Sequence, residues 1–287
     1  MQYLSGALLV ASVITNVLAH GVIDSVTGAN GVTMPGLSVV DGTPRDCATP
    51  SCGAEADTTI FSSSRLSGKA TALGRTNGYG TVDASKIISN FMGGDANSTA
   101  AVAAREIHEA NMMRRLAARG GGSGSAGTKT PAGTTETGVA ASAGVGATKG
   151  LPTCSDDGTL TMNFHQVNQD GAGPLTAMVD PTSGGTDPSA FQQATVTQNV
   201  PGVGIGGLSL ATAMDFPVAI QMPAGMTCQG SIGGATGVCI AKLQNSALAG
   251  PFGGSVAFTQ SPAAKARAIE YNLRKRRFAR DHTANKK

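Results

Sequence analysis

The residues best suited to chemistry are two of the four histidines, His20 and His165. Residues 1–19 have the pattern of a secretory signal, an apolar run that ends on the small-residue motif Val17-Leu18-Ala19. Cleavage after this motif makes His20 the first residue, so its α-amine and ring Nδ1 can chelate one metal ion. A second imidazole completes a T-shaped set of three nitrogens, which suits the tetragonal preference of copper(II). We therefore expect a copper site built from these two histidines.

His165 lies in the clearest strand pattern of the chain. Residues 159–167 alternate apolar and polar side chains, which is the period of a half-buried strand. His165 falls on the polar phase and would meet His20 if the opening strand, residues 20–26, packs beside this one. The alternative is a surface histidine that hydrogen-bonds to a nearby loop. We expect His108 and His282 to be solvated.

Composition and charge limit the class of protein. The signal run is too short to span a bilayer, and no later segment has eighteen uninterrupted apolar residues, so we expect a secreted, extracellular protein without a membrane span. Residues 262–287 hold nine Lys and Arg against Glu270 and Asp281, a net +7; because the whole chain is +3, the remainder carries −4. A mildly acidic body with a basic tail argues against a nucleic-acid-binding face. We expect a monomer.

The five cysteines indicate disulfides in an exported protein, with one thiol left over. Cys228 and Cys239 flank a Gly-rich turn between two strand-like runs, and we pair them first. Cys47, Cys52 and Cys154 compete for a second bond. A zinc site is the weaker interpretation, because these cysteines are not in CxxC spacing.

The elements that would position the histidines form an all-β core in two parts, residues 20–95 and 151–260. Many short strands separated by Gly, Pro and Asn turns predict an immunoglobulin-like β-sandwich. Residues 96–150 are predicted to be an insertion, with a helix over 99–119 and a low-complexity, disordered segment over 120–149. The basic tail, 261–287, begins with Ser261-Pro262, a helix-start pattern. Beyond 159–167, strands are predicted at 20–26, 59–61, 192–200, 216–222 and 238–243.

Three short motifs predict modification of the chain. Asn97-Ser98-Thr99 is an N-glycosylation sequon at the edge of the insertion, so we expect a glycoprotein modified at Asn97. Arg114-Arg115 and Arg274-Lys275-Arg276-Arg277 are candidate dibasic processing sites. The alternative for both is solvated charge.

Several segments together resemble a known family. They are the His-Gly at the expected mature terminus, Phe164 to Pro174, Asn199-Val200-Pro201-Gly202, Asp215-Phe216-Pro217 and Ala249 to Gly254. Over most of its length the chain resembles the Egh-like, appressorium-associated virulence factors of filamentous fungi. That resemblance implies a secreted protein with a part in host penetration.

The amino-terminal His-Gly, the inner histidine His165 and the closing Phe-x-Gln pattern at 258–260 are also similar to the lytic polysaccharide monooxygenases. Those enzymes carry a copper histidine brace on an immunoglobulin-like sandwich. This resemblance implies that His20 and His165 are the brace histidines. It further implies that Gln260 is the glutamine that positions the oxygen species and Phe258 the axial aromatic residue, with Phe252 as a rival. Copper would be the cofactor, and the reaction would be oxidative cleavage of a cell-wall polysaccharide such as chitin.

Two departures separate the chain from that superfamily. No tyrosine is well placed for the axial position, and the chain has no tryptophan to form a flat sugar-binding platform. The absence of these residues argues more strongly against polysaccharide cleavage than against copper binding. The alternative function is therefore a non-enzymatic secreted protein that binds plant or insect surface polymers or fungal wall, its basic tail contacting acidic polymers.

Overall fold

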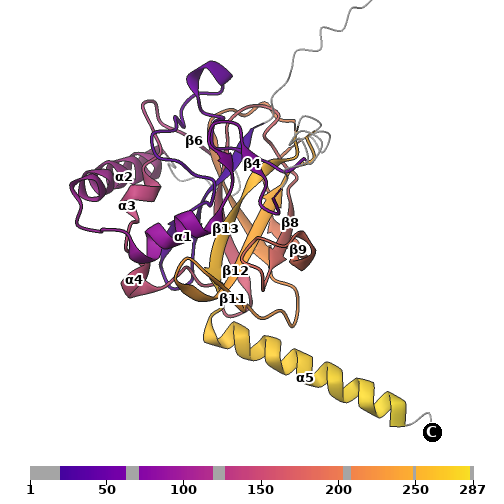
Figure 1. Ribbon diagram of the computed structural model, residues 1–287. Coiled ribbons are helices and arrows are strands. Elements are labelled where there is room, and N and C mark those ends of the chain that lie inside the picture. The colour runs from indigo at the N-terminus through magenta and orange to yellow at the C-terminus, as the bar shows by residue number, and fades with distance from the viewer. Residues whose placement is uncertain (1–19, 63–70, 119–126, 203–207, 248–249, 285–287) are drawn as a thin grey trace, which may run out of the picture.

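The protein is built mainly of antiparallel β-strands, in agreement with the all-β prediction (Figure 1). The computed structural model describes residues 20–62, 71–118, 127–202, 208–247 and 250–284. The strands follow one hydrogen-bonded path in the order β2-β1-β7-β10-β9-β8-β12-β13-β3-β4-β5, while β11 pairs with β12 and β6 with β10. Their bounds are β1 Gly21–Thr27, β2 Thr33–Pro35, β3 Thr59–Ile60, β4 Arg75–Thr76, β5 Gly80–Thr81, β6 Thr128–Lys129, β7 Thr159–Gln166, β8 Thr176–Asp180, β9 Gln192–Gln198, β10 Met214–Gln221, β11 Gly230–Ile232, β12 Ala235–Gln244 and β13 Phe252–Thr259.

The predicted strand over 159–167 is confirmed as β7, and it lies between β1 and β10. Leu160, Met162 and Phe164 alternate along it and are buried. Each fully buried side chain of this size contributes about 1.5–3 kcal/mol. Because both neighbours are antiparallel, the side chains of β7 have partners on either side, and this register fixes where His165 lies.

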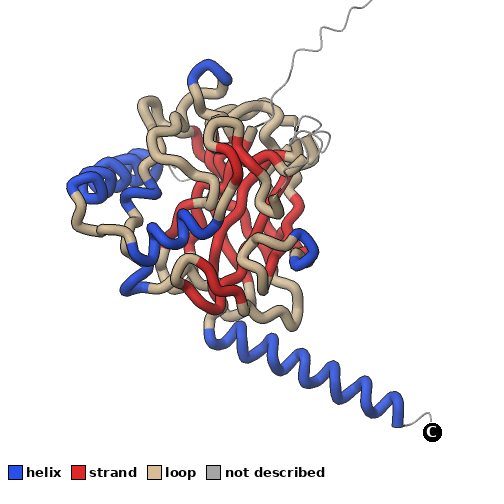
Figure 2. Tube along the Cα trace, viewed as in Figure 1, coloured by secondary structure: helices blue, strands red, loops and turns tan. Residues whose placement is uncertain are grey.

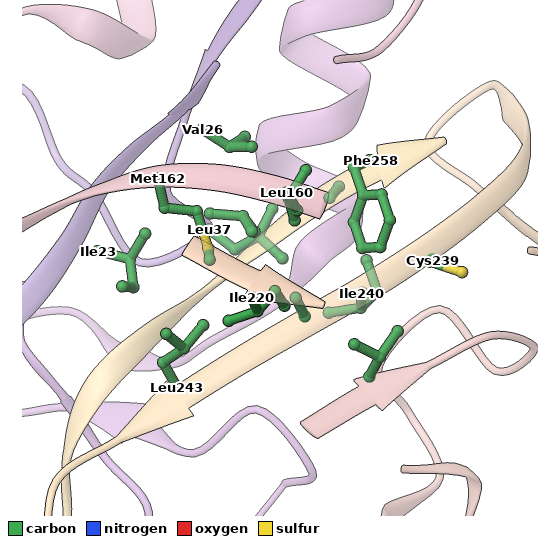
Figure 3. Packing of buried hydrophobic residues seen from close by; sticks show 14 of the residues in the cluster. Ile23, Val26, Leu37, Leu160, Met162, Ile220, Cys239, Ile240, Leu243 and Phe258 are labelled. Carbon is green, nitrogen blue, oxygen red and sulfur yellow. The ribbon is translucent and has the colours of Figure 1, made fainter. Parts of the chain in front are cut away.

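The sheet curls until its two halves meet, and the core fills the space between them (Figure 3). On one side Leu37, which follows β2, donates a backbone hydrogen bond to Ser255 of β13 at 2.8 Å. Close by, a Cβ on Gly254 would lie 2.7 Å from the backbone nitrogen of Ile23. Only glycine allows β13 to approach β1 so closely. The division into two immunoglobulin-like sheets stays a prediction.

The insertion carries more order than its composition predicts. The helix over 99–119 is confirmed as α2 (Thr99–Ala118), which packs with α3 (Gly138–Ala141), while α1 (Ala84–Gly93) contacts α4 (Gly146–Lys149). These four helices gather at one side of the sheet (Figures 1 and 2). The prediction of disorder is wrong for residues 127–149, which form β6, α3 and α4; residues 119–126 lie outside the described part.

Polar anchors explain why this segment of small residues folds. Asp41 accepts hydrogen bonds from the backbone of Val139 and Ala140 at 2.9 and 2.7 Å. Glu136 accepts two from the buried Arg45, at 3.1 and 3.0 Å. Buried hydrogen bonds to charged groups contribute about 1.5–3 kcal/mol each. They replace the apolar contacts that the sequence lacks.

The basic tail is a helix, α5 (Pro262–Ala284), that leaves the body of the protein and extends away from it (Figures 1 and 2). Ser261 caps its first turn, because the side-chain oxygen accepts from the backbone nitrogen of Ala264 at 3.1 Å. Near the middle of α5, Asn272 donates to the Gly225 carbonyl at 2.8 Å. Within the described residues, no helix has both the length and the apolar character that a bilayer crossing requires.

Two disulfides staple loops of the sheet. The predicted pair Cys228–Cys239 is confirmed, and Cys47 bonds to Cys52. Cys154 is a free, buried thiol, and burial raises its pKa above the usual value. The competition among the three remaining cysteines is thereby resolved in favour of the local pair.

Candidate functional site

His165 is held at the carboxyl end of β7 by its neighbour in β10. Its Nδ1 lies 2.8 Å from Oδ1 of Asp215, its partner in the strand register. The second ring nitrogen, Nε2, is buried and has no hydrogen-bond partner within the described part of the chain. When Nδ1 carries the proton and donates it to Asp215, Nε2 presents its lone pair. A carboxylate that fixes a histidine in this way is the usual arrangement behind a metal-ligating imidazole.

His20 immediately precedes β1, beside the end of β7. Gly21 pairs with Gln166 and Val22 with His165, and the His20 carbonyl accepts from the backbone nitrogen of Val167 at 3.0 Å. Since side chains alternate along a strand, His20 and His165 belong to the same face as diagonal neighbours. Such neighbours have Cα atoms about 7–8 Å apart, within reach of long side chains. The strand register therefore brings together the two histidines that the sequence singled out.

Asn168, Glu55 and Phe252 contact His20. Its backbone nitrogen donates to Oδ1 of Asn168 at 2.8 Å, and its ring Nδ1 lies 3.4 Å from Oε1 of Glu55. Asn168 in turn donates from Nδ2 to the same Glu55 oxygen at 2.9 Å. On another side, the ring of Phe252 packs against the imidazole with a centroid distance of 4.6 Å.

Glu55 is a buried carboxylate. Burial raises the pKa of Glu55 to about 7, and the hydrogen bond from Asn168 opposes part of that rise. The loop that carries it is fixed on both sides. The Cys47–Cys52 disulfide precedes Glu55, and Asp57 follows it with a bidentate ion pair to Arg45 at 2.8 and 2.6 Å.

Phe258 and Gln260 lie away from the two histidines, so the prediction that they stand beside the predicted copper site is wrong. Phe258 pairs with Cys239 and is buried in the core, while Phe252 begins the same strand next to His20. Six residues of strand separate the two phenylalanines by about 20 Å. Gln260 binds the backbone of Cys228 and Met226, both at 2.9 Å. The alternative, Phe252, is the aromatic residue in contact with His20.

Strand pairing explains why Phe258 and Gln260 lie away from the histidines. It also explains why the partners of the histidines could not be predicted from the sequence. A two-residue spacing from Phe258 to Gln260 does not reveal which end of a strand faces the site. Asp215, Asn168 and Glu55 come from three separate segments, and only the fold joins them. The one local signal was that Asp215 directly precedes one predicted strand, 216–222, while Asn168 directly follows another, 159–167.

The other predicted positions are separate from this site. Asn97 is exposed in the turn before α2, where a sequon is accessible. His108 is half-buried, with Nδ1 3.4 Å from the Thr137 hydroxyl, rather than fully solvated. Across the described ranges, no three or more His, Cys, Asp or Glu side chains are grouped in a way that could hold a metal ion. A chelate that uses the α-amine needs only two histidines.

Comparison with known proteins places the chain in a family. Residues 18–253 match the Egh16-like virulence factor family. The chain is 64% identical to the appressoria-specific virulence factor GAS2 of Pyricularia oryzae over 284 residues, covering 98% of this chain and 97% of the relative. It is 38% identical over 129 residues to the appressoria-specific virulence factor GAS1 of the same fungus, covering 44% of this chain and 50% of that one. No solved structure matches significantly.

The family match spans β1, β7 and β10, the strands that carry or flank His20 and His165, and it ends just after Phe252. Nearly the whole length of the GAS2 relative aligns with the chain. This chain belongs to the Egh16-like virulence factor family.

Proposed function

We propose that this virulence factor is secreted and binds copper through the mature amino terminus of His20 and the imidazole of His165. The observation that carries the proposal is the buried Nε2 of His165. Asp215 holds the other ring nitrogen at 2.8 Å, and Nε2 has no hydrogen-bond partner in the described structure. A buried polar atom left in this state costs about 1–3 kcal/mol, which a bound ion would offset.

The residues present fit a copper ion in tetragonal coordination. Cleavage before His20 would supply an amine and Nδ1 from one residue, and His165 would supply Nε2, which gives three nitrogen donors. Copper bound there supplies redox chemistry that protein side chains lack. Asp215 keeps the His165 ring in one tautomer, and Phe252 packs against the His20 ring and excludes water from that side. The proposed substrate class is a cell-wall polysaccharide such as chitin.

The test is a copper titration of the secreted protein, after mass spectrometry has confirmed its first residue. With His20 at the terminus, we expect one tight Cu(II) site with a tetragonal, nitrogen-rich paramagnetic resonance spectrum. Loss of a partner behind a metal ligand weakens binding by about tenfold to a hundredfold. His165→Ala removes a ligand itself and should weaken Cu(II) binding by at least that much. His108→Ala, a histidine outside the site, should bind as the wild type does. Unchanged affinity in His165→Ala would rule out the assignment.

A second function, non-enzymatic attachment to host or wall polymers, is favoured by a specific observation. His20 and His165 are both 0% exposed, so a polymer chain would not reach them without rearrangement. The exposed surface suited to a polymer is instead the basic helix α5. Incubation of the copper-loaded protein with chitin, a reductant and peroxide separates the two functions. Release of oxidised oligosaccharides that is lost in His165→Ala supports oxidation. Binding to the polymer without products supports attachment.

A further inference from the structure

His20 is anchored by Asn168 at both ends of its backbone. The Asn168 side-chain oxygen accepts from the His20 nitrogen at 2.8 Å, and the Asn168 backbone nitrogen points to the His20 carbonyl at 3.4 Å. A single residue thereby contacts both polar groups of the His20 backbone. The contacts fix the direction of the His20 nitrogen relative to the end of β7.

Asn168 is itself held in one orientation. Its Nδ2 donates to Glu55 at 2.9 Å, which leaves the amide oxygen to face His20. Its backbone carbonyl accepts from Nε2 of the fully buried Gln166, also at 2.9 Å. An asparagine amide can be turned around without a change of shape, so its partners decide which end presents oxygen. The Glu55 oxygen accepts from Nδ2 and therefore selects the amide orientation that places oxygen on His20.

The side chains of Asn168 and Glu55 face two nitrogens of His20, the backbone nitrogen and ring Nδ1. The backbone nitrogen contacts Asn168, ring Nδ1 lies 3.4 Å from Glu55, and Asn168 and Glu55 are bonded to each other. The backbone nitrogen and Nδ1 must then lie on one side of the residue. This conformation is required of the two atoms if they are to chelate a single ion.

We propose that Asn168 is a positioning residue for the copper site, and that Glu55 sets its orientation. The inference rests on the proposed function. An amine bound to a metal keeps two hydrogens, and the Asn168 oxygen accepts one of them, so the nitrogen lone pair is directed to the ion. The positions of Asn168 and Glu55 reduce the entropy lost when His20 adopts its chelating conformation.

The experiment uses the secreted protein with His20 as its first residue and Cu(II) as the probe. Asn168→Ala should weaken Cu(II) binding about tenfold to a hundredfold, as loss of a partner behind a metal ligand does. Its paramagnetic resonance spectrum should broaden or split, because the amine is no longer held in one direction. Asn163→Ala is the matched control: Asn163 lies on the strand that precedes Asn168 but binds Asp24 at 3.0 Å, and its variant should match the wild type.

Reversing the donor and acceptor of the Asn168–Glu55 hydrogen bond separates a positioning role from a folding defect. Asn168→Asp keeps an oxygen for the amine but sets a carboxylate against Glu55, so affinity should fall. Adding Glu55→Gln restores a donor–acceptor pair with opposite direction, and the double variant should regain affinity to within about threefold of the wild type. A purely structural contribution of Asn168 does not predict this recovery in copper affinity and spectrum.

The outcomes distinguish this inference from the proposal beneath it. If the wild type binds copper and His165→Ala does not, but Asn168→Ala keeps the wild-type affinity and spectrum, the positioning role is wrong and the copper site stands. Failure of the double variant to recover also contradicts the role assigned to Glu55. If the wild type itself shows no tight site, both the copper site and the role of Asn168 are overturned.

Discussion

Arg45 is fully buried and forms ion pairs with two carboxylates, Asp57 at 2.6 Å and Glu136 at 3.0 Å. A third carboxylate, Asp24, also interacts with Glu136. One guanidinium cannot neutralise three buried carboxylates, so a proton is retained in the cluster. Burial, followed by the charge of Asp24, raises the pKa of Glu136 to about 8, against the opposing effect of Arg45.

This cluster predicts a pH dependence of stability. The folded protein keeps a proton on Glu136 that the unfolded chain releases above the ordinary glutamate pKa of 4.5, so the free energy of unfolding should fall as the pH rises from about 5 to about 8. Glu55, with a pKa raised to about 7, contributes in the same direction below that value. Glu136→Gln cannot titrate and should flatten the fall, most clearly between pH 7 and 8.

Urea unfolding of the metal-free protein at a series of pH values measures this dependence. Glu109→Gln makes the same chemical change on the exposed surface of α2 and should leave the pH profile as it is. A Glu136→Gln profile as steep as the wild type between pH 7 and 8 would show that the retained proton resides on another group.

The two candidate ligands could be predicted from the sequence, but the residues that hydrogen-bond to them could not. His20 and His165 could be identified because histidines are rare here and each has a distinctive local setting. Asp215, Glu55 and Asn168 are common residue types in loops and strand ends, and their role depends on pairing between strands far apart in sequence. The choice of Phe258 over Phe252 failed for the same reason: both lie on β13, and only its packing against β1 shows which end is near His20.

Among the elements, α5 combines a strong positive charge with little contact with the body. Arg274, Lys275, Arg276 and Arg277 are exposed on it, and Arg274 pairs with Glu270 one turn earlier. Ala264 and Ala268, in the first two turns, are buried. With the Asn272–Gly225 hydrogen bond, these contacts anchor the first half of the helix, and its basic part is exposed to solvent.

Replacing residues 274–277 with alanine should weaken binding to an anionic polymer matrix at low salt by about fourfold or more, at about 0.2–1 kcal/mol per exposed charge pair. Alanine preserves the helix, and the distance from His20 leaves copper affinity unchanged. Retention on polygalacturonate beads across a salt gradient measures the effect. Lys149→Ala, an exposed cation on α4, should change little. Retention equal to the wild type would remove α5 from the binding surface.

Elements stabilised by local patterns could be predicted from the sequence, and elements stabilised by long-range contacts could not. Strands with apolar alternation, such as β7, and the alanine-rich α2 were predicted within one or two residues, because their signals are local. Residues 127–149 lack large apolar side chains, and the composition therefore favoured disorder. Their order comes from Asp41 and Arg45, residues almost a hundred positions earlier, and a local pattern cannot reveal such contacts.

In the whole molecule, the histidine site and the Cys228–Cys239 disulfide occupy opposite ends of β13. Phe252 at one end contacts His20, and Phe258 near the other pairs with Cys239. The disulfide closes a loop with a sequence separation of 11. Loop-closure entropy gives such a bond about 3 kcal/mol of stabilisation.

Replacing both Cys228 and Cys239 with serine should therefore lower the free energy of unfolding by about 3 kcal/mol. Copper affinity of the folded protein should stay within about twofold, since sites this far apart behave additively. Denaturant unfolding and a Cu(II) titration on the same variant measure the two quantities. A large loss of affinity in the folded variant would show that the ends of the sheet are coupled.

The contact between the His20 nitrogen and Asn168 also bears on when in its life the protein could take up metal. While any residue precedes His20, that nitrogen belongs to a peptide bond, and its lone pair is delocalised into the carbonyl. The precursor then offers one donor fewer and no chelate ring. Under the proposed function, removal of the leader therefore acts as a chemical switch: the precursor lacks the chelating terminus, and the chain acquires it once cleavage frees the His20 amine.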